Sequence, residues 1–541
     1  MRFAASLALV LVLAPLVGAQ DPKAPAPRRL LFVHAGGYLY LNPLTTAAPG
    51  GTDRVRAAAD RLAAGLRVPA AKDNDQLFVL TDHAPDAGPL PTKDAITKVL
   101  DGFCETTRPH DRVVIYFGAH VVPSDGKACL VPLDGNPDVP DTLIPVADIY
   151  AKLKSLKAAQ KVVVWDACRY NPDRVRARRD PGPMTELLFA DLTAVPTGVQ
   201  ALVSCSPGER SLEYFTPRGP AGTFAGSALL DALRQAAADG PKTGPGDPVP
   251  VDDIHKGAAK AVAAVAGTLG LKQTPALAGA APKGASEYDP KAAPAKRFEW
   301  PAPPKGAPAA DVKAVLAELA LPPLIEDDSS IVERLTFHAD ALKGHAADVP
   351  PEEAMKNTDK YPLRVATLRA LQAVRDAWPA GLREGKGITA LSAPVTERGK
   401  KPYIDAQEPV ALALVRLESE LELLAAAVPH RAKETKRWQA HYDYALADLN
   451  LRLAVLNEYN LLLARVRTES LPDLPAGAPG WRLVPAPELK SRREVKALLT
   501  RAHEGFARVA AEHEDTPWAV LAKRSRAFTP GLQWEPVRAP K

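Results

Sequence analysis

Short apolar runs alternate with amphipathic segments along the first half of the chain. The runs that predict buried strands are 30–33, 76–80, 112–117, 161–165 and 199–204, and the helical patterns are 53–66, 92–103, 146–157 and 223–238. This alternation predicts a mostly parallel sheet with helices on both faces. We therefore expect an α/β domain over residues 28–279.

The pattern changes after this α/β segment. Residues 280–310 are rich in Pro, Ala and Gly and hold too little apolar material for a core, which predicts a linker. Residues 311–541 show helical periodicity and predict an all-α C-terminal region. Two leucine stripes separated by Pro429 predict an antiparallel helical hairpin over about 409–467, with Pro409 in its first turn. These stripes form either core or a surface for a protein partner.

The N-terminus is typical of a secretory signal peptide. Arg2 precedes an apolar run from Phe3 to Val17, and Val17 and Ala19 provide small residues at a cleavage site. We expect residues 1–19 to be removed and the mature protein to be periplasmic or extracellular, without a membrane span. The alternative is an uncleaved N-terminal anchor, although the run is short for a span.

Composition narrows the class of protein. The 541 residues are 46% apolar and 24% charged, values that exclude a disordered or collagen-like chain. Proline is unusually abundant, at 54 residues, and we expect it in linkers and loops. The net charge of +5 is spread thinly over the chain and gives no case for a nucleic-acid partner.

The cysteines do not form a recognisable framework. Cys104, Cys129, Cys168 and Cys205 are too few and too scattered for a disulfide-stapled fold, although pairs could form after export. The chain has no C-x-x-C motif, so the sequence predicts no zinc site, no other metal and no cofactor.

Two reactive side chains follow neighbouring predicted strands. His120 comes just after the strand at 112–117, and Cys168 just after the strand at 161–165. Ligands of open parallel sheets bind at the carboxyl ends of the strands, so both residues are expected at one edge. A cysteine nucleophile needs a nearby base to populate its thiolate, and the histidine can then protonate the leaving amine. We therefore predict a Cys–His dyad.

The residues around this pair carry a family resemblance. The sequence D-A-C-R-Y at 166–170 is followed by Asn171-Pro172, and the histidine lies 48 residues before the cysteine. The chain thereby resembles the caspase-like cysteine peptidases, that is caspases, metacaspases and bacterial orthocaspases. Further segments similar to this family are 33–44, 128–135, 204–214, 222–233 and 272–277.

The resemblance implies a role for each site residue. Cys168 would be the nucleophile and His120 the general base and acid, with the backbone N–H groups of Val121 and Cys168 as the oxyanion hole. Asp166 matches the position that metacaspases use to hold a substrate arginine or lysine, a charge-assisted contact. This implies an endopeptidase acting on polypeptides after Arg or Lys, and leaves calcium activation open. Alternatively, Asp166 only caps the turn after its strand.

One triplet departs from the family pattern. The family's histidine sits in G-H-G, whereas this chain has Ala119-His120-Val121. A β-branched valine adopts a positive φ only under strain, and losing one oxyanion donor reduces the rate by about 10²–10³. The alternative function is therefore a weakened or inactive caspase-fold scaffold whose C-terminal helices bind a protein partner.

An arginine-rich loop follows the proposed nucleophile. Its arginines beyond Arg169 are Arg174, Arg176, Arg178 and Arg179. An enzyme that cleaves after basic residues could process itself at these four positions, as members of the resembled family do. The alternative interpretation is a solvated basic loop without a processing role.

Overall fold

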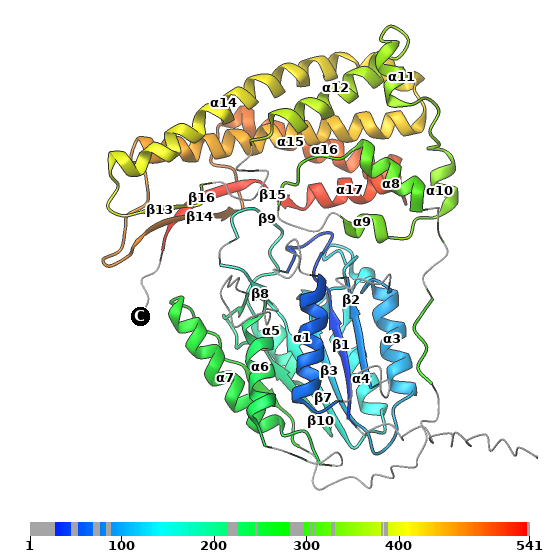
Figure 1. Cartoon of the computed structure of the whole chain (residues 1–541), viewed down its shortest axis with the longest axis vertical. Helices are drawn as coiled ribbons and strands as arrows, with labels where there is room; N and C mark the ends of the chain where they lie inside the picture. Colours follow the sequence, from blue (N-terminus) through cyan, green and yellow to red (C-terminus); the bar gives the residue numbers. More distant parts are fainter. Residues whose placement is uncertain are drawn as a thin grey trace, which may run out of the picture.

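The computed structural model describes residues 28–44, 52–68, 76–82, 88–172, 174–213, 226–241, 243, 247–281, 297–302, 306, 309–325, 330–379, 382 and 388–537. The predicted signal peptide, residues 1–19, lies outside the described residues. An α/β domain and a helical C-terminal region are stacked one above the other (Figure 1).

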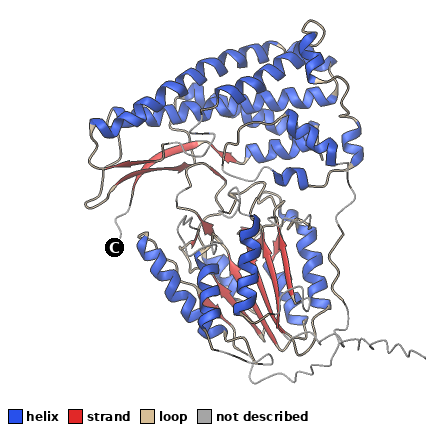
Figure 2. Cartoon of the chain, in the orientation of Figure 1, coloured by secondary structure: helices blue, strands red, loops and turns tan. Residues whose placement is uncertain are grey.

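A six-stranded sheet forms the centre of the α/β domain, in the order β12-β10-β7-β3-β1-β2. Figure 2 shows this sheet, in red, among the helices that cover it. Its strands are β1 (Arg28–His34), β2 (Leu77–Thr81), β3 (Arg112–Gly118), β7 (Gln160–Asp166), β10 (Val199–Val203) and β12 (Ala276–Ala278). Strand β12 pairs antiparallel with β10, and the other neighbours pair in parallel. The predicted mostly parallel sheet is confirmed.

Both faces of this sheet are covered by helices because successive side chains of each strand point to opposite faces. One face packs against α3 (Lys93–Glu105), α4 (Val146–Ser155) and α5 (Glu186–Thr193). The other packs against α1 (Thr52–Gly65), α6 (Ala228–Asp239) and α7 (Val251–Thr268). In β3, Ile115 and Phe117 belong to the first core and Val114 and Tyr116 to the second, as expected for strands buried on both sides.

Short strands extend the chain beyond the carboxyl ends of β3 and β7. After β3 come the antiparallel strands β4 (Val121–Ser124), β5 (Lys127–Leu130) and β6 (Ile144–Pro145). After β7, β8 (Arg169–Tyr170) pairs in parallel with β11 (Ser211–Leu212). These small sheets fix the backbone on either side of the predicted dyad.

The C-terminal region is helical, as predicted. Its helices are α8 (Ala309–Glu318), α9 (Ser330–Arg334), α10 (Ala339–Lys343), α11 (Pro351–Lys356), α12 (Pro362–Ala377), α14 (Glu397–Ala426), α15 (Lys436–Arg467), α16 (Arg493–Glu512) and α17 (Pro517–Arg526). Most side chains of α15 are buried, and α12, α14 and α16 surround it. No helix among the described residues is long and apolar enough to cross a membrane.

The predicted hairpin is present but longer than expected. Helix α14 begins at Glu397 rather than near residue 409, and Pro402 and Pro409 both lie inside it. Thr396 caps its first turn by accepting from the Gly399 N–H. Tyr403, Val410 and Leu417, on either side of Pro409, are buried in the helical core, so packing holds the helix across its prolines. The break predicted at Pro429 is a short 3₁₀ segment, Val428–Lys433, between α14 and α15.

The all-α expectation is incomplete. Strands β13 (Ala390–Ser392), β14 (Gly480–Ala486) and β16 (Gly531–Pro536) form an antiparallel sheet beside the helices. Trp481 and Leu483 of β14 and Trp534 of β16 are buried in the helical core. The sheet completes that core.

A two-stranded sheet joins the two regions. Strand β9 (Ala177–Arg178), in the arginine-rich loop, pairs antiparallel with β15 (Phe528–Thr529) (Figure 1). The Arg179 N–H donates to the Ala527 carbonyl at 3.0 Å, which extends this pairing. We call the segments 177–179 and 527–529 the seam. Through it the C-terminal region holds the loop that follows Cys168.

Part of the predicted linker is among the described residues. Phe298 packs against Phe78 of the α/β domain, with ring centroids 4.6 Å apart. The boundaries of the linker, 280–310, and of the two regions that flank it stay predictions.

Candidate active site

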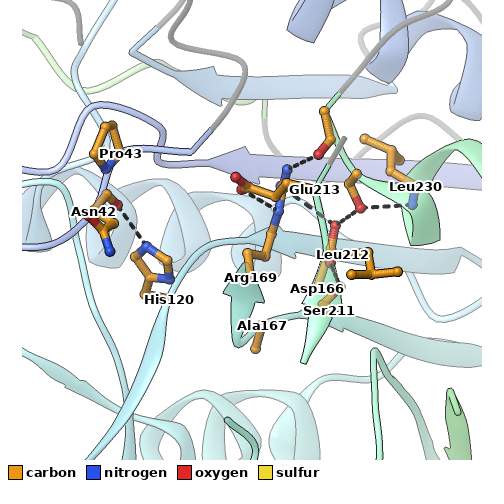
Figure 3. Close-up of polar contacts among 12 residues, drawn as sticks. Asn42, Pro43, His120, Asp166, Ala167, Arg169, Ser211, Leu212, Glu213 and Leu230 are labelled. Atoms are coloured by element: carbon orange, nitrogen blue, oxygen red, sulfur yellow. Dashed lines mark hydrogen bonds and ion pairs between the residues drawn. The ribbon is translucent and has the colours of Figure 1, made fainter. Parts of the chain in front are cut away.

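His120 lies between β3 and β4 and is buried, with 1% of its surface exposed. Its Nε2 is 2.9 Å from the Asn42 carbonyl oxygen (Figure 3). A carbonyl only accepts hydrogen bonds, so Nε2 carries the proton and Nδ1 has a free lone pair. Nδ1 is buried without a hydrogen-bond partner among the described residues.

The surroundings of His120 keep it neutral and oriented. Burial lowers the pKa of His120 to about 4, against the opposing effect of its bond to Asn42. The backbone N–H of His120 donates to the Tyr38 hydroxyl at 2.8 Å. The Tyr38 ring packs against the imidazole, with ring centroids 4.6 Å apart. A base whose tautomer is fixed by a third group is the arrangement found in nucleophilic catalysis.

Cys168 lies at the matching position after β7. Gly118 of β3 pairs with Asp166 of β7, so His120 and Cys168 each follow a paired strand end by two residues. Cys168 is fully buried and has φ 55°, a left-handed conformation that is uncommon for residues other than glycine. Residues held in such strained conformations cluster at functional sites.

The Cys168 thiol lies near a second cysteine, Cys205. A hydrogen bond with the Cys168 thiol, together with burial, raises the pKa of Cys205 well above its usual value. No hydrogen bond joins Cys168 to His120 in the described part of the chain. All four cysteines are free thiols. The two predicted catalytic residues therefore lie at neighbouring strand ends without direct hydrogen bonding.

Val121 shows none of the strain considered for this position. It is the first residue of β4 and is absent from the non-glycine residues with positive φ. The Val131 N–H donates to the His120 carbonyl at 2.9 Å, and hydrogen bonds alternate along an antiparallel pair. This register directs the Val121 N–H away from β5. The proposed oxyanion-hole roles of Val121 and Cys168 stay predictions.

Asp166, the predicted substrate-binding residue, is fully buried. Its carboxylate accepts from the hydroxyls of Tyr116 at 2.7 Å, Ser211 at 2.9 Å and Ser227. Figure 3 shows Asp166 beside Ser211. Ser227 also caps α6 by accepting from the Leu230 N–H. This network holds the carboxylate behind Arg169, whose Nη1 is 3.7 Å from it.

A cleft of about 1160 Å³ lies between the α/β domain and the C-terminal sheet. The α/β residues that line it include His120, Arg169, Arg174, Arg179, Asp180, Arg210 and Glu213. The C-terminal residues that line it are Val484, Pro485, Ala486, Pro487, Thr529 and Glu535. The proposed base therefore faces a cavity large enough for an extended peptide segment, and Asp166 is not part of its lining.

The four arginines of the proposed processing loop have different surroundings. Arg178 is buried in the seam, its N–H donates to the Asn42 side chain at 2.8 Å, and its Nη1 donates to the Tyr38 carbonyl. Arg174 donates to the Pro43 carbonyl, and Arg176 lines a small cavity against the helical core. Arg179 forms an exposed ion pair with Asp138 at 2.5 Å. Self-cleavage at these positions stays a prediction.

Several polar residues of the site were not singled out from the sequence. Tyr38 and Asn42 lie within the family-like segment 33–44, and Ser211 and Glu213 within 204–214. The similarity of these segments to the family indicated that they belong to the domain. Nothing in their composition distinguished a residue that orients the histidine from an ordinary loop residue.

One group in the described part of the C-terminal region has metal-ligand chemistry. Asp443, Glu512 and His513 place ligand atoms within 4.8 Å of one another. The Arg431 guanidinium forms ion pairs with both carboxylates. Because that cation already pairs with both carboxylates, the arrangement does not favour a metal ion.

Comparison with protein families agrees with this architecture. Residues 57–283 match the model of the caspase domain, peptidase family C14. The chain therefore contains a caspase-like peptidase domain, as its resemblance implied. Strand β1 precedes the matched residues but belongs to the same sheet, so the domain begins before residue 57. No curated protein matches the chain.

Proposed function

We propose that this chain is an exported cysteine endopeptidase whose dyad is Cys168 and His120. Export rests on the signal-peptide pattern of residues 1–19. The peptidase chemistry rests on the caspase-like domain and on the two strand ends described above. The C-terminal region restrains the loop after the nucleophile through the seam, and its binding of a protein partner stays a prediction.

One observation carries the proposal. A strained, left-handed Cys168 and a neutral His120 with a free Nδ1 lone pair follow adjacent strands, each two residues beyond a paired position. Other buried polar atoms of the described residues also lack a hydrogen-bond partner, but His120 is the histidine among them that lines the cleft. A free imidazole lone pair on a cleft is the group that a thiol nucleophile requires.

The reaction follows from this geometry once the Cys168 side chain turns from Cys205 toward His120. His120 Nδ1 takes the thiol proton, and the thiolate attacks the peptide carbonyl carbon. The N–H groups of Val121 and Cys168 stabilise the resulting oxyanion. His120 then donates its proton to the leaving amine, and water hydrolyses the thioester with the imidazole again as base.

We assign the preference for Arg or Lys before the cleaved bond to the carboxylates of Asp166 and Glu213. A guanidinium already binds between them in the folded chain, that of Arg169. Planar guanidinium groups suit paired carboxylate acceptors. The same two residues disfavour a substrate aspartate at this place.

A second candidate function is a caspase-fold scaffold without catalysis. The buried Cys168 thiol, which has no hydrogen bond to His120 among the described residues, favours it. In that case the domain serves to position the C-terminal helices, and the cleft binds without cutting.

Peptide hydrolysis separates the two candidates. Wild type, Cys168→Ala and Cys205→Ala are assayed under reducing conditions on fluorogenic peptides ending in Arg, Lys or Asp, with and without calcium. The peptidase proposal expects Cys168→Ala to reduce hydrolysis by about 10³ or more and Cys205→Ala to retain it. Equal, background-level hydrolysis by all three proteins, each folded by circular dichroism, would establish the scaffold instead.

A further inference from the structure

We infer that Arg169 is an internal occupant of the first specificity pocket, where its guanidinium takes the place of a substrate arginine. This rests on the proposed function only in naming the pocket as a substrate site. The occupancy itself follows from the contacts of Arg169. It makes Arg169 a specificity-determining residue that competes with basic substrates.

The Arg169 guanidinium lies between two carboxylates and forms ion pairs with both, while its Nε and Nη1 make no hydrogen bond with the described residues. Its Nε is 3.0 Å from Glu213 Oε1, its Nη1 is 3.7 Å from Asp166 Oδ2, and its Nη2 donates to the Gly226 carbonyl at 3.0 Å (Figure 3). Arg169 is 3% exposed. Burial lowers the pKa of Arg169, but the charges of Glu213 and Asp166 outweigh this effect and raise it. The side chain is therefore a buried, paired cation.

The acceptors are held in place without Arg169. Tyr116, Ser211 and Ser227 donate hydroxyl hydrogens to Asp166. Removing one partner of a buried ion pair leaves an uncompensated charge, which is strongly unfavourable. A variant without the Arg169 side chain would thus keep the Asp166 carboxylate preorganised but without its cation, whereas Glu213 keeps Arg174, whose Nη2 is 3.9 Å from Oε2. The vacated site should therefore prefer a small cation.

The vacated space would open into the cleft. Arg169 and Glu213 both line the cleft, whereas Asp166 lies behind them. His120 lines the same cleft. Shortening Arg169 therefore connects Asp166 to the cavity that His120 faces, and this gives a substrate side chain a path to it. A purely structural ion pair away from a cavity would offer no such path.

Arg169 also has a fixed relation to the nucleophile. It directly follows Cys168 and pairs with Ser211 in the β8–β11 ladder. The Ser211 N–H donates to the Cys168 carbonyl at 3.0 Å. The backbone is thereby held on both sides, so substitution of the Arg169 side chain leaves the pocket walls attached to the sheet.

The test measures binding without requiring activity. Wild type, Arg169→Ala and Arg169→Gln are titrated with ethylguanidinium, with ethylurea as the uncharged control, and thermal unfolding is followed. Both variants should show a saturable rise in Tm of about 3–5 °C with ethylguanidinium alone, and wild type should show a smaller rise. Adding Asp166→Asn to either variant should abolish the rise. If Arg169→Ala does not fold alone, ethylguanidinium should restore its folding and ethylurea should not.

Two results would overturn the inference. One is the absence of any ethylguanidinium effect in both Arg169 variants, and the other is the same effect in wild type. The binding result is independent of the peptidase proposal, because an inactive scaffold would still bind the cation. If hydrolysis occurs, Arg169→Gln should also shift the ratio of Arg to Asp peptide cleavage at least tenfold toward Arg. A shift toward Asp would contradict the assignment.

Discussion

The two regions of the molecule bury charged groups in different ways. In the C-terminal region, Arg452 of α15 is buried beside Asp448, and Glu458 accepts from the N–H and hydroxyl of Ser491. Arg452 and Asp448 line a cavity of about 580 Å³. In the peptidase domain, His120 and Arg169 are equally buried and line a cleft. Access to a cavity therefore does not separate the two regions by itself. The difference is that both carboxylate oxygens of Glu458 accept hydrogen bonds, whereas His120 Nδ1 has no hydrogen-bond partner among the described residues.

The seam connects these two kinds of organisation. Asn42 holds His120 through its carbonyl and accepts the Arg178 N–H through its side chain. Arg178 in turn pairs with Phe528 of the C-terminal region. A short chain of backbone contacts thus runs from the helical core to the proposed base. The C-terminal region should influence the site without contributing a reactive group.

The largest expected effect is on proteolysis of the arginine-rich loop, and it distinguishes a substitution in the seam from one elsewhere in the helical core. Phe528 and Phe506 are both buried in that core, and Ala at either position should reduce the free energy of unfolding by about 3–5 kcal/mol. Only Phe528 lies in the seam. Limited trypsin digestion with N-terminal sequencing should show cleavage at Arg174–Arg179 at least tenfold faster in Phe528→Ala than in Phe506→Ala. Equal cleavage rates in the two variants would contradict the claim that the seam holds the loop in place.

Acidification should reduce the free energy of unfolding through both regions, but it should reduce activity only through His120 in the α/β domain. The pKa values of His120 and His513 are each lowered to about 4 by burial. The unfolded chain, with histidine pKa near 6.5, then binds protons more readily between pH 4 and 6.5. The contribution of each neutral, buried histidine to the free energy of unfolding is therefore fully present above pH 6.5. It is lost as the pH falls toward 4, by up to about 3 kcal/mol for each histidine.

Urea unfolding at several pH values measures this effect. His120→Gln and His513→Gln should each reduce the loss of stability on acidification. In wild type, the acid limb of kcat/KM should lie near pH 4 rather than 6.5, because His120 stays neutral until then. An acid limb near pH 6.5 that disappears in His513→Gln would show that His513, in the C-terminal region, controls the activity. That result would contradict the role given to His120.

A smaller effect tests the contact that orients His120. Tyr38→Phe removes the hydroxyl that accepts the His120 N–H and should destabilise the fold by about 1–3 kcal/mol, since a buried donor is left unsatisfied. It should also lower kcat. Tyr150→Phe is the matched control, because its buried hydroxyl accepts from Trp165 Nε1 at 3.0 Å, away from His120. Equal losses of kcat in both variants would argue against a positioning role for Tyr38.

The smallest effect concerns a single link between the regions. Arg482 of β14 donates to the Pro172 carbonyl at 2.9 Å. Arg482→Ala should cost about 1 kcal/mol or less and accelerate tryptic cleavage of the loop about twofold, since one hydrogen bond is lost. Arg416→Ala, which removes only an exposed ion pair with Asp376, should leave loop cleavage unchanged. The same digestion assay distinguishes them.

The sequence was most informative where the chain repeats a simple pattern. The strands β1, β2, β3, β7 and β10 follow the predicted apolar runs, because strands buried on both faces need continuous hydrophobic sequence. Their order along the chain also predicted that His120 and Cys168 would share one edge of the sheet.

The remaining features depend on contacts that sequence patterns do not encode. Asn42 holds His120 through a backbone carbonyl, which any residue type provides. The seam pairs two short strands, Ala177–Arg178 and Phe528–Thr529, from distant parts of the chain. The placement of Arg169 against Glu213 requires the β8–β11 pairing, which brings together two segments of only two residues each.

Covalent labelling of the nucleophile tests the central claim most directly. A peptidyl-arginine chloromethyl ketone is incubated with the full-length reduced protein, and the alkylated residue is identified by peptide mass spectrometry. We predict a single adduct on Cys168, formed faster in Phe528→Ala, where the loop is released, and absent in His120→Ala. Labelling of Cys104, the least buried thiol, without labelling of Cys168 in either wild type or Phe528→Ala would contradict a latent Cys–His peptidase.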